Sequence, residues 1–160
     1  MKNIFTTLTI ILILSNLSCN SVDNSLKISE DQVKDTVGNF FASIEVGSEL
    51  NTNDYITDDF KIVELGGPYT LDEFWALIAE SQGDNITISR KWDLSNWSIS
   101  IDVNSAHASF KNNGTFITSV DGQEVTSNPV WLESGYLVLV DGKLKIKYFQ
   151  SEEVSDYLSK

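Results

Sequence analysis

The first half of the chain repeats hydrophobic residues at helical spacing in two places. The first stripe falls on one face of a helix and consists of Val33, Val37, Phe40, Phe41 and Ile44. Ser29 and Gln32 form an S-x-x-Q capping box ahead of this stripe, and Gly47 is the predicted stop after it. A shorter helix is predicted to follow over residues 52–57.

The second helical stripe comes after a short predicted strand. Residues 60–64 alternate hydrophobic with polar or smaller side chains, and Gly66-Gly67-Pro68 ends this strand. Thr70 and Glu73 then form a T-x-x-E capping box, and Gly83 closes the helix. The apolar stripe of this helix consists of Leu71, Phe74, Trp75 and Ile78.

From residue 85 onward hydrophobic positions alternate with polar ones, which is the period of strands with one buried face. Four long strands are predicted, over residues 86–103, 105–119, 123–140 and 143–150. Dipeptides that tolerate the positive φ of tight hairpins stand at Asn113-Gly114, Asp121-Gly122 and Asp141-Gly142. Helices followed by an antiparallel meander predict an α+β fold, with the helices on one face of the sheet.

Residues 136–140 are apolar on both faces of their strand. One face is expected to lie on the core, and the other then needs a cover. The predicted cover is either the C-terminal segment 151–158 or a second copy of the chain. The second option predicts a homodimer that pairs through the outer sheet face.

The N-terminus has the pattern of an export signal. Residues 4–14 are mostly apolar, which suits a signal-peptide core and is too short to cross ~30 Å of hydrocarbon. Ser18 then precedes Cys19, the only cysteine, and this arrangement resembles a bacterial lipobox, although Asn16 stands where leucine is usual. The alternative is ordinary secretion that leaves Cys19 unmodified.

This pattern divides the chain into three parts. A signal peptide is predicted over residues 1–18, a lipidated Cys19 with its tether over 19–28, and a single domain over 29–160. The predicted location is the bacterial cell envelope, at the periplasmic or outer-membrane face, with the lipid anchor as the only contact with the membrane.

Composition narrows the classes of function. The 160 residues include 23 acidic and 11 basic side chains, for a net charge of −12. Such a surface repels phosphate backbones and anionic headgroups, which argues against nucleic-acid binding. One cysteine and one histidine exclude an internal disulfide and the Cys-rich or His-rich sets that bind zinc. We therefore predict no metal and no cofactor.

The order of elements resembles the NTF2-like superfamily, including its SnoaL-like and DUF4440-type domains, over residues 29–152. The residues that carry the resemblance are the hairpin Asn104–Ala108 and the final hairpin over 131–150, WLESGYLVLVDGKLKIKYFQ, in which Leu144 stands where the family often has Trp. The resemblance implies a cone, in which a curved sheet wraps the long helix and leaves a pocket at the open end. It also implies small apolar or amphipathic ligands and pairing through the outer sheet face.

Enzymes of the superfamily, such as ketosteroid isomerases and polyketide cyclases, place an acid–base carboxylate in that pocket. The isomerase site does not carry over, because Phe40 stands near the tyrosine position and Leu65 aligns with the base. Glu64 is the best candidate base, and a solvated carboxylate at a strand end is its alternative. Glu133 is expected to face solvent, with entry into the pocket as its alternative. Alternation also places His107 on the outer face.

Six residues are candidates for the pocket, with core packing as the alternative for the aromatic ones: Tyr55, Glu64, Trp75, Trp92, Trp131 and Tyr148. The leading hypothesis is an exported, non-catalytic domain that binds a small ligand or a protein partner. The alternatives are a SnoaL-like enzyme of the isomerase, cyclase or hydratase type that abstracts a proton with Glu64, and a homodimeric interaction protein of the envelope.

Overall fold

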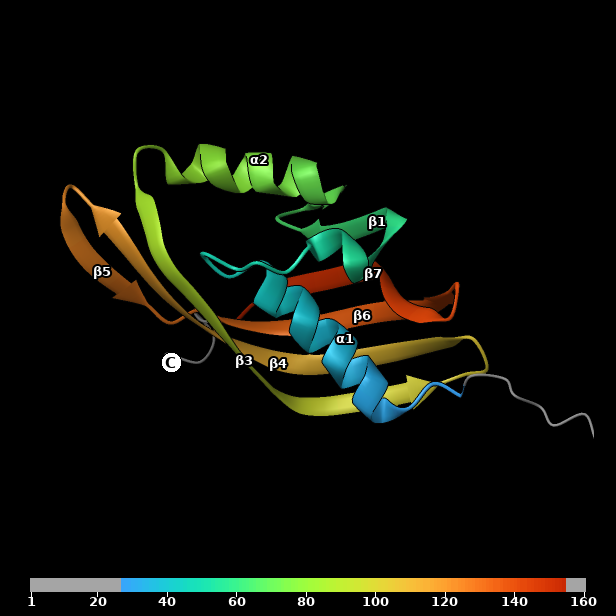
Figure 1. The fold of residues 1–160 in the computed structure, drawn as a ribbon. Helices are drawn as coiled ribbons and strands as arrows, with labels where there is room; N and C mark the ends of the chain where they lie inside the picture. Colours follow the sequence, from blue (N-terminus) through green and yellow to red (C-terminus); the bar gives the residue numbers. More distant parts are fainter. Residues whose placement is uncertain (1–26, 155–160) are drawn as a thin grey trace, which may run out of the picture.

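The computed structural model describes residues 27–154, which form two helices, a 3-10 turn and a bent sheet (Figure 1). In chain order the elements are α1 (Glu30–Ser43), η2 (Thr52–Asp54), β1 (Ile56–Glu64), β2 (Gly67–Tyr69), α2 (Leu71–Gln82), β3 (Ile86–Ile101), β4 (Ser105–Val120), β5 (Gln123–Ser127), β6 (Val130–Val140) and β7 (Lys143–Glu153). The predicted signal peptide and Cys19 lie outside the described residues. Neither described helix is long and apolar enough to cross a membrane.

Both helices begin where their capping boxes predict. Ser29 Oγ accepts a hydrogen bond from the backbone N–H of Gln32, whose side-chain oxygen accepts one from the backbone N–H of Ser29. Thr70 and Glu73 repeat this reciprocal pair at α2. Each box satisfies two backbone donors that the helix itself leaves free. These two contacts fix where α1 and α2 enter the fold.

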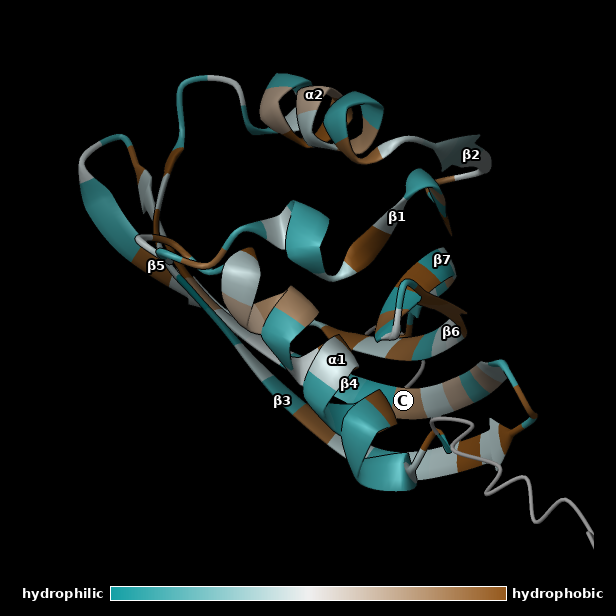
Figure 2. Cartoon of the chain, turned by 45° about the vertical axis from the view of Figure 1, so that its right-hand side comes forward, coloured by the Kyte–Doolittle hydropathy of each residue, from teal (hydrophilic) through white to brown (hydrophobic). Residues whose placement is uncertain are grey.

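The sheet wraps α1 and is open at one end. Its strand order is β2-β1-β7-β6-β4-β3, with β5 added to β4; the pairs are antiparallel except β1 with β7. α1 lies against the concave face, and α2 crosses above it near the open end (Figures 1 and 2). The core between α1 and the sheet contains Val33, Val37, Phe40, Leu137, Ile146 and Phe149, all nearly inaccessible to solvent. The predicted α+β fold is confirmed.

Several predicted boundaries are wrong. The strand expected over 123–140 is two strands, because Asn128 and Pro129 interrupt it and proline cannot donate a ladder hydrogen bond. The helix expected over 52–57 is a single 3-10 turn, and β1 begins at Ile56 rather than near residue 60. The final strand continues past residue 150 to Glu153. α1 ends at Ser43, before the predicted stop.

Two of the three dipeptides predicted to form hairpin turns do so, and the third lies within a strand. Asp121-Gly122 and Asp141-Gly142 occupy tight turns with positive φ at both residues. Asn113-Gly114 lies inside β4 instead, opposite β3 and β6. Gly114 is needed there for space, because a Cβ at this position would lie 2.8 Å from a ring carbon of Trp131. This glycine therefore serves packing rather than a turn.

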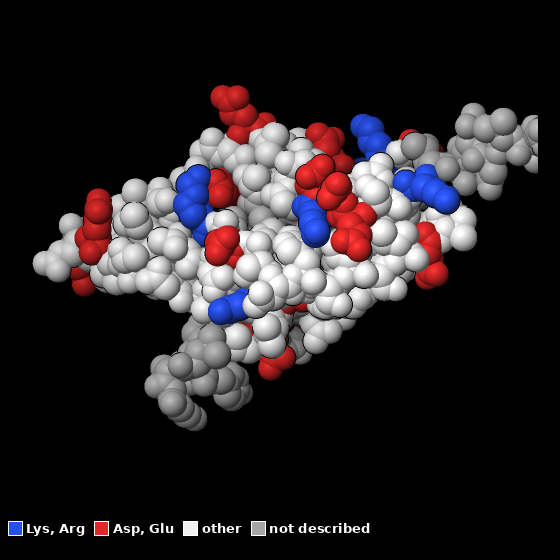
Figure 3. Space-filling model, turned by 90° about the horizontal axis from the view of Figure 1, so that it is seen from below, with Lys and Arg blue, Asp and Glu red and all other residues white. Residues whose placement is uncertain are grey.

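The outer face of the sheet leaves several large side chains exposed, among them Leu132, Tyr136, Val140 and Tyr148. Residues 151–153 extend β7, and residues 155–158 of the segment predicted as a cover lie outside the described residues. His107 also lies on this face, where its Nε2 is 2.8 Å from the hydroxyl of Ser134. On the face seen in Figure 3, acidic and basic groups are interspersed with uncharged surface. That a second copy of the chain covers this outer face remains a prediction.

Candidate functional site

A cavity of about 220 Å³ lies between α1, α2 and the concave face of the sheet. Most of its lining is aromatic or aliphatic. The charged side chains on its wall are Glu64, Arg90 and Glu133. An apolar cavity with a few polar groups is the usual form of a small-molecule site.

Aromatic rings form one wall of this cavity. The Trp92 ring lies 5.1 Å from those of Phe41 and Phe116 and 5.6 Å from that of Trp131, measured between ring centroids. These residues come from α1, β3, β4 and β6, so their contact depends on the strand register. The indole Nε1 of Trp92 is buried and donates to no described group.

Three adjacent strands bring two carboxyl groups to the same level of the sheet. Glu133 of β6 pairs with Ser151 of β7. On the other side of β7, Val63 pairs with Gln150, so Glu64 comes level with Ser151. Neighbouring strands are about 4.8 Å apart, which places the backbones of the two glutamates roughly 10 Å apart. Both side chains line the cavity, so they converge from either side of Ser151.

Glu133 is buried, with 5% of its surface exposed. Its Oε1 accepts a hydrogen bond of 3.1 Å from Nδ2 of the fully buried Asn112, and its Oε2 has no partner among the described residues. Burial raises the pKa of Glu133 to about 8, because it removes water from the charged form. The side chains of Asn112 and Ser151 oppose this rise in pKa, and the carboxyl of Glu64 adds to it.

Burial also raises the pKa of Glu64, to about 7, and the carboxylate of Glu153 adds to the rise. A hydrogen bond from the Trp131 side chain opposes it. The two cavity carboxyls interact, so they titrate as a pair. Near neutral pH this pair holds between one and two protons, and one group is therefore able to accept a proton while the other donates one.

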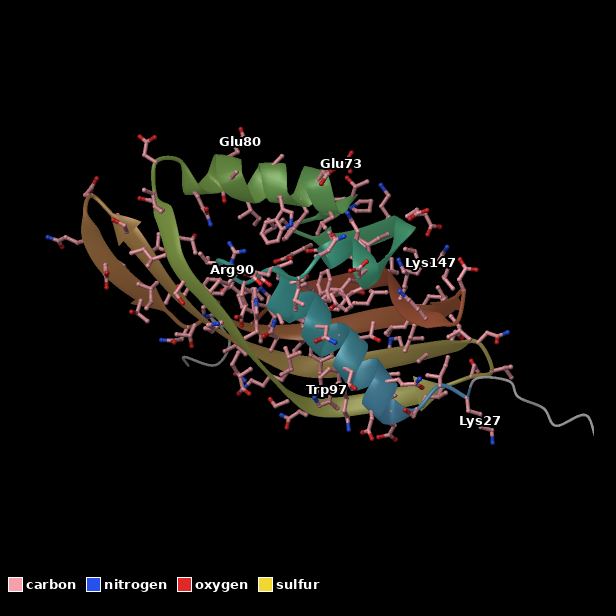
Figure 4. The ribbon with its side chains drawn as sticks, in the orientation of Figure 1. Lys27, Glu73, Glu80, Arg90, Trp97 and Lys147 are labelled. Carbon is pink, nitrogen blue, oxygen red and sulfur yellow. The ribbon has the colours of Figure 1, made fainter. Side chains whose placement is uncertain are left out.

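Arg90 is the cationic side chain of the cavity. Its guanidinium lies 4.9 Å from the ring centroid of Trp75 and 5.8 Å from that of Phe116, and one N–H donates to the backbone oxygen of Ile44 at 3.1 Å. Figure 4 shows Arg90 between α2 and α1, whereas Glu80 points away from the molecule. Burial lowers the pKa of this guanidinium from its ordinary value.

The structure brings together four of the six residues that the sequence suggested for the pocket: Glu64, Trp75, Trp92 and Trp131. The other two lie elsewhere. Tyr55 follows η2 and lines a shallow depression with Leu144. Tyr148 is 39% exposed on the outer face, because an irregularity in the β6–β7 pairing leaves Lys147 unpaired and turns Tyr148 away from the side of Ile146.

Two functional residues were missed or misplaced by sequence reasoning. Glu133 was expected to face solvent, which is wrong: Trp131, Glu133, Gly135 and Leu137 share the buried face of β6. The alternation with the exposed Leu132 carried that signal. Arg90 was not singled out, since it is polar in a segment that alternates hydrophobic and polar residues. Among the described residues, no group of three or more His, Cys, Asp or Glu side chains is able to hold a metal ion.

Solved structures share this arrangement of helices and sheet. A type 2 hexachlorocyclohexane dehydrochlorinase is 10% identical, with a TM-score of 0.61 over 77% of this chain and 83% of that one. A candidate ketosteroid isomerase from Shewanella frigidimarina is 18% identical, with a TM-score of 0.56 over 77% and 96%. The fold is NTF2-like.

The same fold appears in the hub of a CaMKII from S. rosetta, at 12% identity and a TM-score of 0.59 over 78% of this chain and 95% of that one. No protein-family model and no curated protein matches the chain. The three solved structures carry names of different function, and a shared fold does not select among them. The chemistry of this chain therefore depends on the residues of its own cavity.

Proposed function

We propose that this protein binds a small, largely apolar molecule in its cavity and moves a proton on it, with the Glu64–Glu133 pair as base and acid. The observation that carries the proposal is the convergence of these two carboxyls in a cavity whose lining is mostly aromatic or aliphatic. In a solvated surface pair, carboxyls stay ionised and are poor at exchanging protons near neutral pH. Here burial brings both groups into the working range.

The roles follow from the environment of each group. Glu64 is less buried and has the lower pKa, so it ionises before Glu133 and is the member that accepts a proton from carbon. Glu133 is more deeply buried and stays protonated, so it returns a proton to the product.

This assignment fits a substrate with a C–H bond next to a carbonyl. Glu64 takes the proton, the electron pair of the C–H bond moves into the carbonyl to form an enolate, and Glu133 protonates another atom of the same molecule. The result is an isomerisation; when the electron pair instead expels a leaving group, the result is an elimination. Atoms and charge balance in both cases without an added cofactor.

Deuterium exchange tests this proposal without knowledge of the product. The protein is incubated in D₂O with a panel of cyclic and aromatic ketones, and NMR follows loss of the proton next to the carbonyl. Glu64→Gln is expected to slow the catalysed exchange by about 100-fold or more, because general-base catalysis contributes ~100- to 10,000-fold. Glu80→Gln is the matched control, since Glu80 is exposed on the outer side of α2.

The same experiment separates catalysis from binding alone. If NMR shows a ketone bound in the cavity and its exchange is the same with wild type, Glu64→Gln and Glu80→Gln, the protein binds without transferring a proton. That outcome favours a non-catalytic binding domain, as expected from Phe40, which lacks the hydroxyl that an isomerase tyrosine supplies. Export to the envelope and a lipid on Cys19 belong to this proposal and rest on residues 4–19 alone.

A further inference from the structure

The half-buried Arg90 of the cavity has no carboxylate partner among the described residues. Each described lysine ion pair involves Lys34, Lys61, Lys91 or Lys147, and all of these lysines lie outside the cavity lining. A guanidinium has five N–H donors, and Arg90 gives one of its hydrogen bonds to the Ile44 carbonyl. The chain carries 23 acidic residues, so the absence of such a partner among the described residues is unexpected on composition alone.

Removing a charge from water without a charged partner is costly, and buried charges in proteins are usually paired. The two rings hold the Arg90 guanidinium in place from α2 and from β4, and the Ile44 carbonyl holds it from the end of α1. Three elements thus fix the orientation of the group. A fixed guanidinium with free donors is the usual partner of carboxylate, sulfonate and phosphate groups.

The carboxyl pair of the cavity is not that partner. A guanidinium close to Glu64 or Glu133 would favour the ionised carboxylates and lower their pKa values, whereas both pKa values are raised. The strand register explains the separation. Arg90 pairs with Phe116, six residues along β4 from Phe110, which pairs with Glu133. Six residues of β4 therefore separate the level of Arg90 from the level of Glu133 in the sheet.

We infer that the cavity takes a small organic anion, with its acidic group on Arg90 and its apolar body along the aromatic wall toward Glu64 and Glu133. The inference deepens the proposed function by naming the substrate class, and it rests on that proposal only in requiring that the cavity binds a small molecule. The anionic group then anchors one end of the ligand. The carbon that loses its proton lies at the other end.

Two fluorescent probes with the same ring system test this assignment. Anilinonaphthalene sulfonate carries a negative charge, and phenylnaphthylamine is the same framework without it. Titrations of the full chain near pH 6 keep most of both cavity carboxyls protonated, so that they do not repel the anion. Energy transfer from tryptophan reports binding to the protein, and weaker binding to Gly114→Ala, whose added Cβ crowds two rings of the cavity wall, places the probe in the cavity.

Arg90→Gln is expected to weaken binding of the sulfonate about tenfold or more, since a charge-assisted hydrogen bond is worth at least that factor. Binding of the neutral probe changes less than about twofold, because both probes bury the same apolar surface. Lys91→Gln is the matched control: it removes the same charge one residue away, where Lys91 pairs with Glu45 on the surface. It is expected to leave both affinities unchanged.

Circular dichroism and urea unfolding establish that each variant is folded. If Arg90→Gln does not fold, two other measurements test the inference: titrations of Arg90→Lys and titrations of wild type at rising salt concentration. If Arg90 holds the sulfonate group, salt weakens binding of the sulfonate probe and leaves binding of the neutral probe unchanged. If Arg90→Gln weakens the binding of both probes equally, Arg90 maintains the shape of the cavity and does not bind the negative charge of the sulfonate. Unchanged affinity for both would place the anion elsewhere. Either result overturns the inference and leaves ligand binding intact, whereas a wild type that binds neither probe removes the premise of both proposals.

Discussion

Replacing Glu133 by glutamine is expected to make the protein more stable at neutral and alkaline pH. Glutamine has nearly the same shape, and its side-chain oxygen still accepts the hydrogen bond from Asn112 Nδ2. Oε2 of Glu133 makes no hydrogen bond to a described residue, so the amide nitrogen of glutamine replaces an atom that has no such partner. The substitution therefore removes one ionisable group from the interior and little else.

The size of the effect follows from the pKa of Glu133, which is about 8 in the folded protein against an ordinary value of 4.5. Between these two values the unfolded chain has released the proton that the folded chain keeps, so stability falls as pH rises. The contribution of Glu133 is fully present below pH 4.5 and is lost as pH rises through about 8. At about 1.4 kcal/mol per pH unit, wild type loses roughly 2 to 3 kcal/mol between pH 5 and pH 7 from this group.

Urea unfolding, followed by tryptophan fluorescence at several pH values, measures this loss. Glu133→Gln and wild type are expected to be similar in stability at pH 5, and the variant to be more stable by about 2 to 3 kcal/mol at pH 7. Glu152→Gln is the control, because Glu152 is an exposed carboxylate on the neighbouring strand. Glu64 still titrates in the variant, so some pH dependence persists. A pH dependence of stability that is the same in wild type and Glu133→Gln would refute the burial argument.

Two further substitutions test the packing and the caps. Gly114→Ala places a Cβ 2.8 Å from a ring carbon of Trp131 and 3.1 Å from one of Phe116, both in the cavity wall. We expect this variant to lose about 1 to 3 kcal/mol of stability in urea unfolding and to bind the probes more weakly. Unchanged stability and binding would show that the two rings move aside to accommodate the methyl group. Ser29→Ala removes the N-cap of α1 and is expected to lower the stability by about 1 kcal/mol in the same assay, whereas Ser29→Gly lowers it less. An alanine variant that is as stable as wild type would contradict the role of the cap.

Much of the fold was predictable because the signals for it are local. A capping box needs two side chains three residues apart, and both boxes form at Ser29 and Thr70. An Asp-Gly turn needs two adjacent residues that accept positive φ, and the turns at Asp121 and Asp141 form as expected. Alternation along β3 and β4 likewise depends on neighbours only. Local chemistry therefore sufficed for both α-helices and most of the meander, but not for η2, β2 or the break between β5 and β6.

The candidate site was predictable only in part, because its residues meet through strand register. Glu64, Glu133 and Ser151 are far apart in sequence and come level only when β1, β7 and β6 pair as they do. The face of a residue also depends on irregularities that no local pattern reveals. The irregularity beside Tyr148 turned a predicted pocket residue outward.

The amino-acid sequence by itself determined the helices, the meander and the α+β class, since each follows from contacts within a few residues. Tertiary structure alone decided that Glu133 is buried, that Arg90 enters the cavity between Trp75 and Phe116, and that Gly114 makes room for Trp131. The physical reason is that burial and pairing are properties of surfaces brought together by folding. A charge acquires a shifted pKa only when distant segments remove the water around it.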